Sequence, residues 1–144
     1  MLVGKGMETE QYQTINLETR AYVMARYQPD SPVKERFFSW WGAFAEFFNQ
    51  RPFDLIYMDQ LTVTPLYTTV GSDETAQYYQ ESRSIITDGQ EQGLIKDGDI
   101  SLLNQFVRIA LVNLIKLHHS KGKNLDKGEL KAILNLCWDG LAIH

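Results

Sequence analysis

The sequence predicts an all-α protein with six helices in one domain that spans residues 1–144. Two observations favour this class. Apolar residues recur at intervals of three and four through most of the chain. The four prolines and several of the glycines fall between these periodic runs, where helices start or stop. A strand could form around residues 68–70 (Thr-Thr-Val), but no second segment is visible to pair with it.

The first helix is expected from about Glu8 to Tyr27. Its inner stripe combines apolar and polar residues, namely Tyr12, Ile15, Thr19, Tyr22, Val23 and Arg26. Ser31 is expected to cap the second helix, with Pro32 at the first helical position. This helix should end before Pro52, because a residue that precedes proline avoids helical geometry.

The second helix has an unusually aromatic inner face. At 100° per residue, one stripe collects Val33, Phe37, Trp40, Trp41, Phe44, Phe47 and Phe48. Rings of this size can fill an interior, or they can line an apolar pocket. Both alternatives stay open at this point, because the pattern is the same for each.

Three more segments continue the helical pattern. A third helix is expected from Pro52 to about Thr62, followed by a loop over Pro65–Ser72. Ser72 or Asp73 would cap the fourth helix, which would run to about Gln92 and stop at Gly93, with Leu94 as a trailing apolar contact. The inner stripe of this fourth helix includes hydroxyl groups and a glycine.

The last two helices carry surplus apolar surface. The fifth is expected from Asp99 or Ser101 to about Ser120, and nine of the twelve residues in the run 106–117 are apolar. The sixth is expected from Asp126 to about Ile143. A helix that is apolar nearly all round is buried on more than one side, so the pair could form a four-helix interface in a twofold dimer. Alternatively, both helices pack wholly within one chain.

Composition narrows the function. The formal net charge is −4, and no basic cluster occurs beyond Lys121 and Lys123, so direct DNA binding by these residues is not expected. The single cysteine, Cys137, lies in an apolar run and reads as a core residue in a reducing compartment. We expect a cytoplasmic protein, since no apolar run resembles a signal peptide or a membrane span.

No motif of catalysis, metal binding or cofactor binding is apparent, so an enzyme is not expected. His118 and His119 are adjacent and point about 100° apart on a helix, which prevents them from chelating one ion. Polar groups on inner stripes are more informative, because they could tip into an apolar cavity and bind an amphipathic small molecule. These groups are Thr19, Arg26, Tyr57, Tyr78 and Ser82. Each tyrosine could equally be a core residue with its hydroxyl at the surface.

Three stretches resemble the C-terminal domain of the tetracycline-repressor-like (TetR) family of bacterial regulators. They are Phe37–Tyr67, Asp88–Leu103 and Leu134–Leu141, and the match lies in their order and spacing. Members of that family begin with a DNA-binding head that contains a helix-turn-helix, and this chain has no match to it. DNA binding would therefore depend on a head that is not present here, and residues Glu8–Tyr27 would correspond to the connecting helix.

The resemblance implies a homodimer and a small hydrophobic or amphipathic effector. The implied pocket residues are Trp40, Phe44, Phe48, Tyr57, Met58, Leu61, Tyr78, Ser82 and Phe106. The implied dimer residues are Leu103, Val107, Leu111 and Leu114 on the fifth helix, and Leu130, Ile133, Cys137 and Leu141 on the sixth. The inward and partner-facing stripes could be exchanged. Two other functions stay open: a headless protein that forms heterodimers with full-length regulators, and a small helical enzyme.

Overall fold

The computed structural model describes the backbone of residues 2–61 and 78–144, and the side chains of residues 10–61 and 79–144. Six helices lie in these segments: α1 (Leu2–Arg26), α2 (Val33–Gln50), α3 (Pro52–Leu61), α5 (Tyr78–Glu91), α6 (Ile100–Ser120) and α7 (Lys127–Leu141). The all-α prediction is confirmed. The predicted loop at 65–72 and the predicted start of the fourth helix fall outside the described residues.

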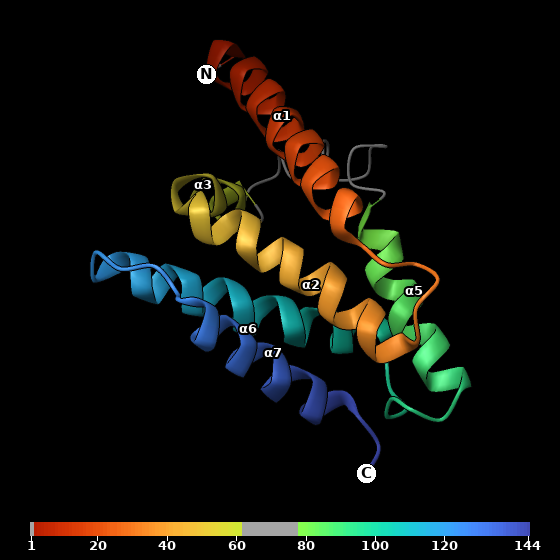
Figure 1. Ribbon diagram of the computed structural model, residues 1–144. Helices are drawn as coiled ribbons and strands as arrows, with labels where there is room; N and C mark the ends of the chain where they lie inside the picture. The colour runs from red at the N-terminus through yellow and green to blue at the C-terminus, as the bar shows by residue number, and fades with distance from the viewer. Residues whose placement is uncertain (1, 62–77) are drawn as a thin grey trace.

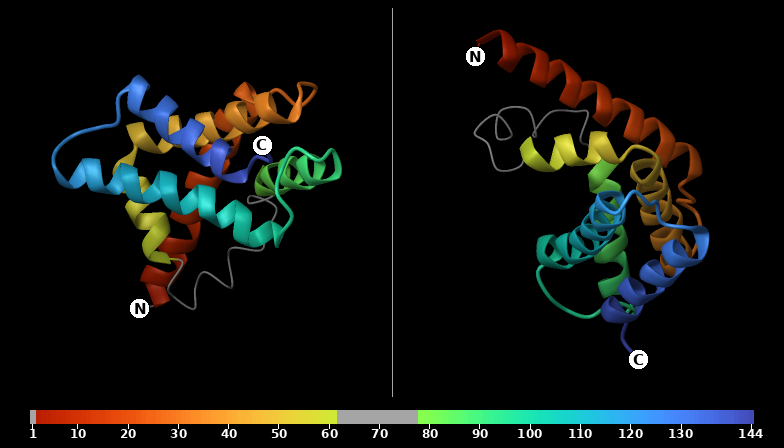
Figure 2. Two further views of the ribbon diagram at one scale, coloured as in Figure 1. Left: turned by 90° about the horizontal axis from the view of Figure 1, so that it is seen from below. Right: turned by 90° about the vertical axis from the view of Figure 1, so that its left-hand side faces the viewer.

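Helix α2 lies at the centre of the bundle and packs against each of the other five described helices (Figure 1). Helix α1 crosses one side of α2, and its N-terminal end extends beyond the body of the molecule (Figure 2). Helices α6 and α7 run side by side on the opposite side of α2, and α5 closes one end. The outer surfaces of α6 and α7 therefore face away from the rest of the chain.

The aromatic stripe of α2 forms the core. Phe37, Trp40, Trp41 and Phe44 have no exposed surface. Their rings meet mainly edge to face, as between Trp41 and Phe44, whose centroids lie 5.3 Å apart at 74°. Burying one such side chain contributes roughly 2–3 kcal/mol, so this helix is a principal source of stability.

The predicted starts of the last two helices, at Asp99 and Asp126, are confirmed, and the predicted cap of the second helix is wrong. The Asp99 carboxylate accepts a hydrogen bond from the Leu102 N–H, and Asp126 caps α7 in a reciprocal pair with Glu129. Ser31 does not cap α2. Pro32 occupies the N-cap position in an extended conformation, with φ −57° and ψ 159°, and no side chain caps this end.

Backbone hydrogen bonds join the residues that follow α5 to the residues at the end of α7. Gly93 adopts φ +72°, which favours glycine, so the predicted stop is confirmed. The apolar contact that follows comes from Ile95, which is fully buried, whereas Leu94 is exposed. Helix α7 ends at Leu141 and not at Ile143, because Ala142 is extended and pairs with Ile95 in an antiparallel bridge.

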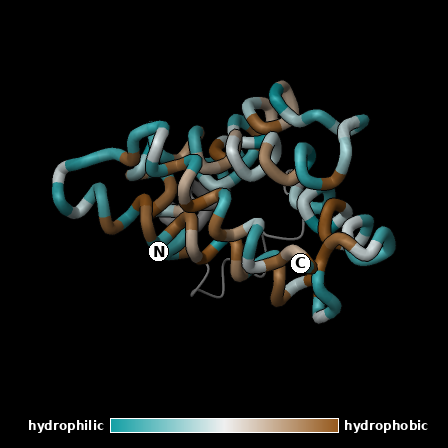
Figure 3. Tube along the Cα trace, turned by 60° about the horizontal axis from the view of Figure 1, so that its bottom comes forward, coloured by the Kyte–Doolittle hydropathy of each residue, from teal (hydrophilic) through white to brown (hydrophobic). Residues whose placement is uncertain are grey.

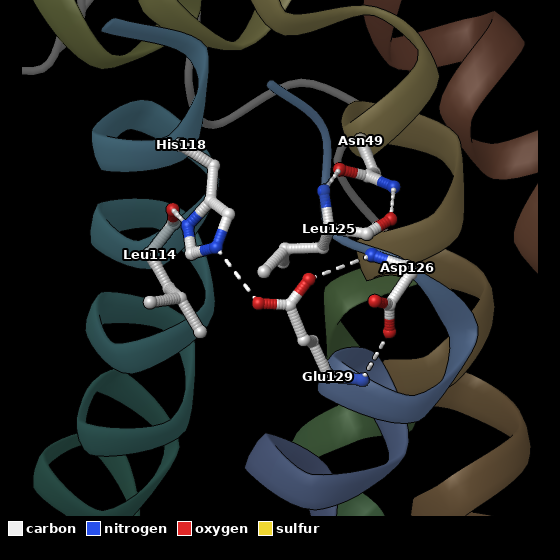
Figure 4. A network of polar contacts seen from close by, with 6 residues as sticks. All are labelled: Asn49, Leu114, His118, Leu125, Asp126 and Glu129. Carbon is white, nitrogen blue, oxygen red and sulfur yellow. Dashed lines mark hydrogen bonds and ion pairs between the residues drawn. The ribbon is translucent and has the colours of Figure 1, made fainter. Parts of the chain in front are cut away.

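The turn between α6 and α7 is hydrophilic at its tip (Figure 3) and is held by a polar network (Figure 4). The Asn49 amide bonds both the N–H of Leu125, at 2.9 Å, and its C=O, at 2.8 Å. The ring nitrogens of His118 lie 3.1 Å from the Leu114 oxygen and 3.0 Å from Glu129 Oε2. These contacts tie α2, α6 and α7 together at one end.

By length and apolar composition alone, α6 could also cross a membrane, the one helix of the described segments that meets this test. Core helices of water-soluble proteins meet the same test. Here one side of α6 packs against α2, α3, α5 and α7, and 28% of its apolar window is buried. The side that remains uncovered is described below.

Candidate functional site

The aromatic rings predicted to wall a pocket do lie together. The Trp40 and Phe44 rings are stacked, with centroids 5.8 Å apart, and Phe48 follows at 5.1 Å from Phe44. Tyr79 of α5 lies against both Trp40 and Phe44, at 5.7 Å and 6.1 Å. The wall thus joins α2 to α5.

Helix α3 borders the same core. Met58 and Leu61 are buried in the main apolar cluster, and Tyr57 is half-buried against it. The side chain of Tyr78, also predicted here, lies outside the described residues. Three of the predicted α3 and α5 residues therefore join the aromatic wall in one apolar interior.

Two linked hydrogen bonds lie in this interior between α5 and α6, and they join Tyr79, Ser82 and Asn104. The Ser82 hydroxyl is fully buried and donates to the Tyr79 carbonyl oxygen at 2.7 Å. It accepts a hydrogen bond from Asn104 Nδ2 at 3.1 Å. The other end of that amide, Asn104 Oδ1, is buried and has no hydrogen-bond partner among the described residues. Asn104 was not among the predicted residues, although its spacing of three and seven from Val107 and Leu111 places it on the inner stripe of α6.

The two polar residues of α1 that were predicted to tip into a cavity, Thr19 and Arg26, contact other residues of α1 instead. Thr19 is buried, and its hydroxyl bonds the carbonyl of Ile15 at 2.6 Å within the same helix. Arg26 does not point inward: its side chain is exposed and stacks on the Tyr22 ring, 3.5 Å from the centroid. Asn16, which was not predicted, is 1% exposed and leaves its Nδ2 without a partner.

Phe106 does not belong with the pocket residues. Its side chain is 48% exposed on the outward side of α6. Its ring lies across α7 at Gly140, where an added Cβ would approach it to 3.3 Å. At 100° per residue, Phe106 lies on the side of α6 nearly opposite to Asn104 and Leu111, which explains why it cannot face the same interior.

Four of the eight residues predicted to face a partner subunit lie in the core of the chain instead. Val107, Leu111, Cys137 and Leu141 are buried inside the protomer, so they are not available to a second copy. The other four predicted positions are half-buried at the margin of the core, namely Leu103, Leu114, Leu130 and Ile133. Which stripe faces a partner subunit stays a prediction, and within this chain the stripe of Val107, Leu111, Cys137 and Leu141 is the buried one.

Several large apolar side chains are exposed on the helix pair α6 and α7. Six of the ten exposed large apolar side chains in the described segments lie on α6, on α7 or just after α7. We call this surface the outer face; it consists of Leu102, Phe106, Ile109, Leu117, Leu136 and Ile143. Isolated surface leucines are ordinary, whereas several large apolar side chains on one helix pair are less usual on a water-exposed surface.

Charged groups lie at the edges of the interior. Asp59 of α3 pairs with Lys116 at 2.6 Å and lies 3.9 Å from Arg108, while Arg36 pairs with Asp88 at 2.7 Å. Burial raises the pKa of the Cys137 thiol to about 11, which leaves it protonated and unreactive at neutral pH. Within the described residues, no group of three or more His, Cys, Asp and Glu side chains is arranged to hold a metal ion.

Comparisons with known proteins agree with this architecture. Residues 32–142 match the protein family described as "Tetracyclin repressor-like, C-terminal domain". No curated protein matches the chain at a significant level.

Three solved structures share the fold. A protein from Shewanella sp. PV-4, described as a tetR family transcription regulator, aligns with a TM-score of 0.79 at 13% identity, over 97% of this chain and 76% of its own. A protein from Vibrio parahaemolyticus, described as a transcriptional regulator of the TetR family, aligns at 0.70 and 19% identity, over 97% and 74%. A protein of unknown function from Rhodococcus sp. RHA1 aligns at 0.70 and 20% identity, over 94% and 73%.

Proposed function

The chain belongs to the tetracyclin repressor-like C-terminal domain family, and from that premise we propose that it is the effector-sensing and dimerisation domain of a transcription regulator. In this proposal it forms a homodimer and binds a small, mostly apolar effector in the cytoplasm. DNA contact is assigned to no residue of this chain. The outer face of α6 and α7 is the observation that carries the proposal.

The dimer would be formed through the outer face. An apolar surface of this kind is unfavourable in water, and a second copy offers the same surface by symmetry. Leu136, at 66% exposed, and Leu102, at 69%, are the most protruding members. The half-buried residues Leu103, Leu114, Leu130 and Ile133 would border this contact, while the four fully buried positions would support it from inside.

The effector would lie against the aromatic wall. The proposed contacts are Trp40, Phe44, Phe48, Tyr57, Met58, Leu61, Tyr78 and Ser82. The support is that the described members of this set share one apolar interior, into which a buried hydrogen-bonding chain projects. Phe106 is left out of the set, since it is part of the outer face.

A signal could pass from the wall to α1. The Tyr22 ring lies 5.4 Å from Phe47, and its hydroxyl donates to Glu46 at 2.7 Å. Arg51 adds an ion pair to Glu18. An effector that binds one placement of α2 more tightly than another would therefore shift the position of α1. In the family resemblance, α1 corresponds to the helix that connects to the DNA-binding head.

Light scattering of a matched pair of variants tests the dimer. Leu136→Glu places a charge on the outer face, and Leu17→Glu makes the same change at an exposed leucine of α1, which is 51% exposed. We expect the unmodified protein and Leu17→Glu to be dimers at micromolar concentration and Leu136→Glu to be a monomer that keeps its helical circular dichroism. Monomers in all three samples would overturn the proposal.

A further inference from the structure

Only one end of the buried Asn104 amide forms a hydrogen bond within the described residues. Its side chain is 5% exposed, its Nδ2 donates to Ser82, and its Oδ1 has no hydrogen-bond partner. The orientation of the amide follows from its neighbour. The single proton of Ser82 is directed to the Tyr79 carbonyl oxygen at 2.7 Å, so Ser82 can only accept from Asn104. An unpaired acceptor is therefore left in the interior.

Such an acceptor is costly in a folded protein and rare. The fold is able to satisfy an asparagine fully: Asn49 is also buried, and both ends of its amide bond the Leu125 backbone. Asn49 therefore has a structural role, whereas Asn104 Oδ1 makes no hydrogen bond to the described residues. A group left in this condition is a candidate for a ligand contact.

The other buried polar groups that lack a hydrogen-bond partner in the described segments are also uncharged. Asn16 Nδ2 on α1 and Trp41 Nε1 on α2 are buried donors with no partner in the described segments. The buried polar residues of the described segments are asparagines, a threonine and a serine, with no charged side chain among them. The partly buried charges are already paired, as Arg36 is with Asp88 and Asp59 is with Lys116. A charged ligand group would have to compete with these ion pairs for a counter-ion.

We propose that the effector is a neutral molecule with a hydrogen-bond donor, such as a primary amide or an alcohol on an apolar body, and that it donates to Asn104 Oδ1. This inference rests on the proposed function, because it specifies the chemistry of the effector that the interior accepts. A carboxylate has no proton to donate to Asn104 Oδ1. An ammonium group can donate, but it would carry an uncompensated charge into an apolar interior.

Isothermal titration calorimetry at pH 7.5 with three probes of equal length tests the proposal. Octanamide is neutral and can donate, octanoate is an anion, and octylamine is a cation at this pH. We expect octanamide to bind about tenfold more tightly than either charged probe, the ratio expected when one buried hydrogen bond is made or missed. The same three head groups on a benzyl body would repeat the comparison with a different apolar shape.

Two variants separate ligand binding from folding. Asn104→Leu removes the unpaired acceptor together with the hydrogen bond to Ser82, at similar volume. The gain from the first offsets the loss of the second, so we expect the variant to abolish the preference for octanamide with little change in the thermal midpoint of the free protein. Asn135→Leu makes the same change at an exposed position of α7 and should keep the preference. A merely structural Asn104 would instead lower the midpoint and leave the ratio of affinities unchanged.

The outcomes distinguish this inference from the proposed function. Charged probes that bind as tightly as octanamide would overturn the neutral effector and leave an effector-binding domain intact. A preference that persists in Asn104→Leu would overturn the role of Asn104. Failure of all probes on both bodies to bind would count against an effector site of any chemistry.

Discussion

Asn49 and Asn104 show how one residue type can take two roles in the same interior. Asn49 closes two hydrogen bonds to the turn before α7, and Asn104 closes one to Ser82. A buried group that loses its partner costs about 1–3 kcal/mol. Replacing Asn104 loses the bond to Ser82 but also removes an unpaired acceptor, and Ser82 keeps its bond to the Tyr79 carbonyl oxygen, so the two effects offset each other. The two residues should therefore respond in opposite ways to the same substitution.

Asn49→Leu should lower the free energy of unfolding by about 2–3 kcal/mol, because it leaves the N–H and C=O of Leu125 buried without partners. Asn104→Leu should leave it unchanged or slightly raised. Urea denaturation followed by circular dichroism measures both. Equal losses in the two variants would contradict the assignment of Asn49 as structural and Asn104 as unpaired.

Glu129 should make stability depend on acid pH. The Asp126 backbone N–H, and then the His118 side chain, hold the pKa of Glu129 below the ordinary value of 4.5. A carboxyl whose pKa is lowered by folding stabilises the protein above its unfolded pKa, and this contribution is lost as the pH falls through the lower folded value. The affected window therefore begins near pH 4.5 and extends downward.

Glu129→Gln should accordingly lower the urea midpoint at pH 7, and its difference from the unmodified protein should shrink as the pH falls toward 3. Glu91→Gln, at an exposed glutamate outside the α6–α7 network, should follow the unmodified protein at every pH. A deficit in Glu129→Gln that stays constant with pH would show that the carboxylate charge does not matter there.

Two helical glycines give a matched test at the scale of elements. An added Cβ at Gly89 of α5 would lie 2.4 Å from Ile95 Cδ1, whereas one at Gly42 of α2 would meet Leu134 Cδ1 at an ordinary 3.6 Å. Gly89→Ala should destabilise the protein by about 2 kcal/mol through overpacking. Gly42→Ala should stabilise it by about 0.5–1 kcal/mol, since alanine favours the helix. Thermal unfolding of both variants checks the sign, and a stable Gly89→Ala would mean that Ile95 moves freely.

Sequence periodicity could predict the helices but not which side of α6 faces inward. The aromatic stripe of α2 has a polar opposite side, so its orientation followed directly from the pattern. Helix α6 is apolar nearly all round, so Val107 and Phe106 looked equally suited to either side. Only the packing of α6 against α2, α3 and α5 separates them, and that packing depends on contacts far apart in sequence.

The residues of the candidate effector site could also be predicted only in part from the sequence. Trp40, Phe44 and Phe48 were recognisable because rings at helical spacing must share one side of a helix. The unpaired oxygen of Asn104 was not, because its state depends on which way the Ser82 proton points, 22 residues away. Arg26 was misplaced for a related reason: the Tyr22 ring offers it an exposed stacking partner that a periodic pattern does not reveal.

At the scale of the whole molecule, dimerisation and stability should be linked. If the outer face is covered by a second copy, unfolding separates the subunits, so the thermal midpoint should rise with protein concentration. We expect a rise of several degrees between 1 and 100 μM for the unmodified protein and for Leu17→Glu, and none for Leu136→Glu. Midpoints independent of concentration in all three would indicate a stable monomer and a different role for the outer face.

Backbone hydrogen bonds join residues 94–96 to residues 141–143. They close the intervening chain into a non-covalent ring. The N–H of Lys96 bonds the Leu141 oxygen at 2.8 Å, and the N–H of Ile143 bonds the Leu94 oxygen at 3.0 Å. The ring contains both helices of the outer face, and neither bond can break alone without straining the other. The amide protons of Lys96 and Ile143 should therefore exchange with deuterium at one common rate, as a single cooperative unit, even though they stand 47 positions apart in the chain.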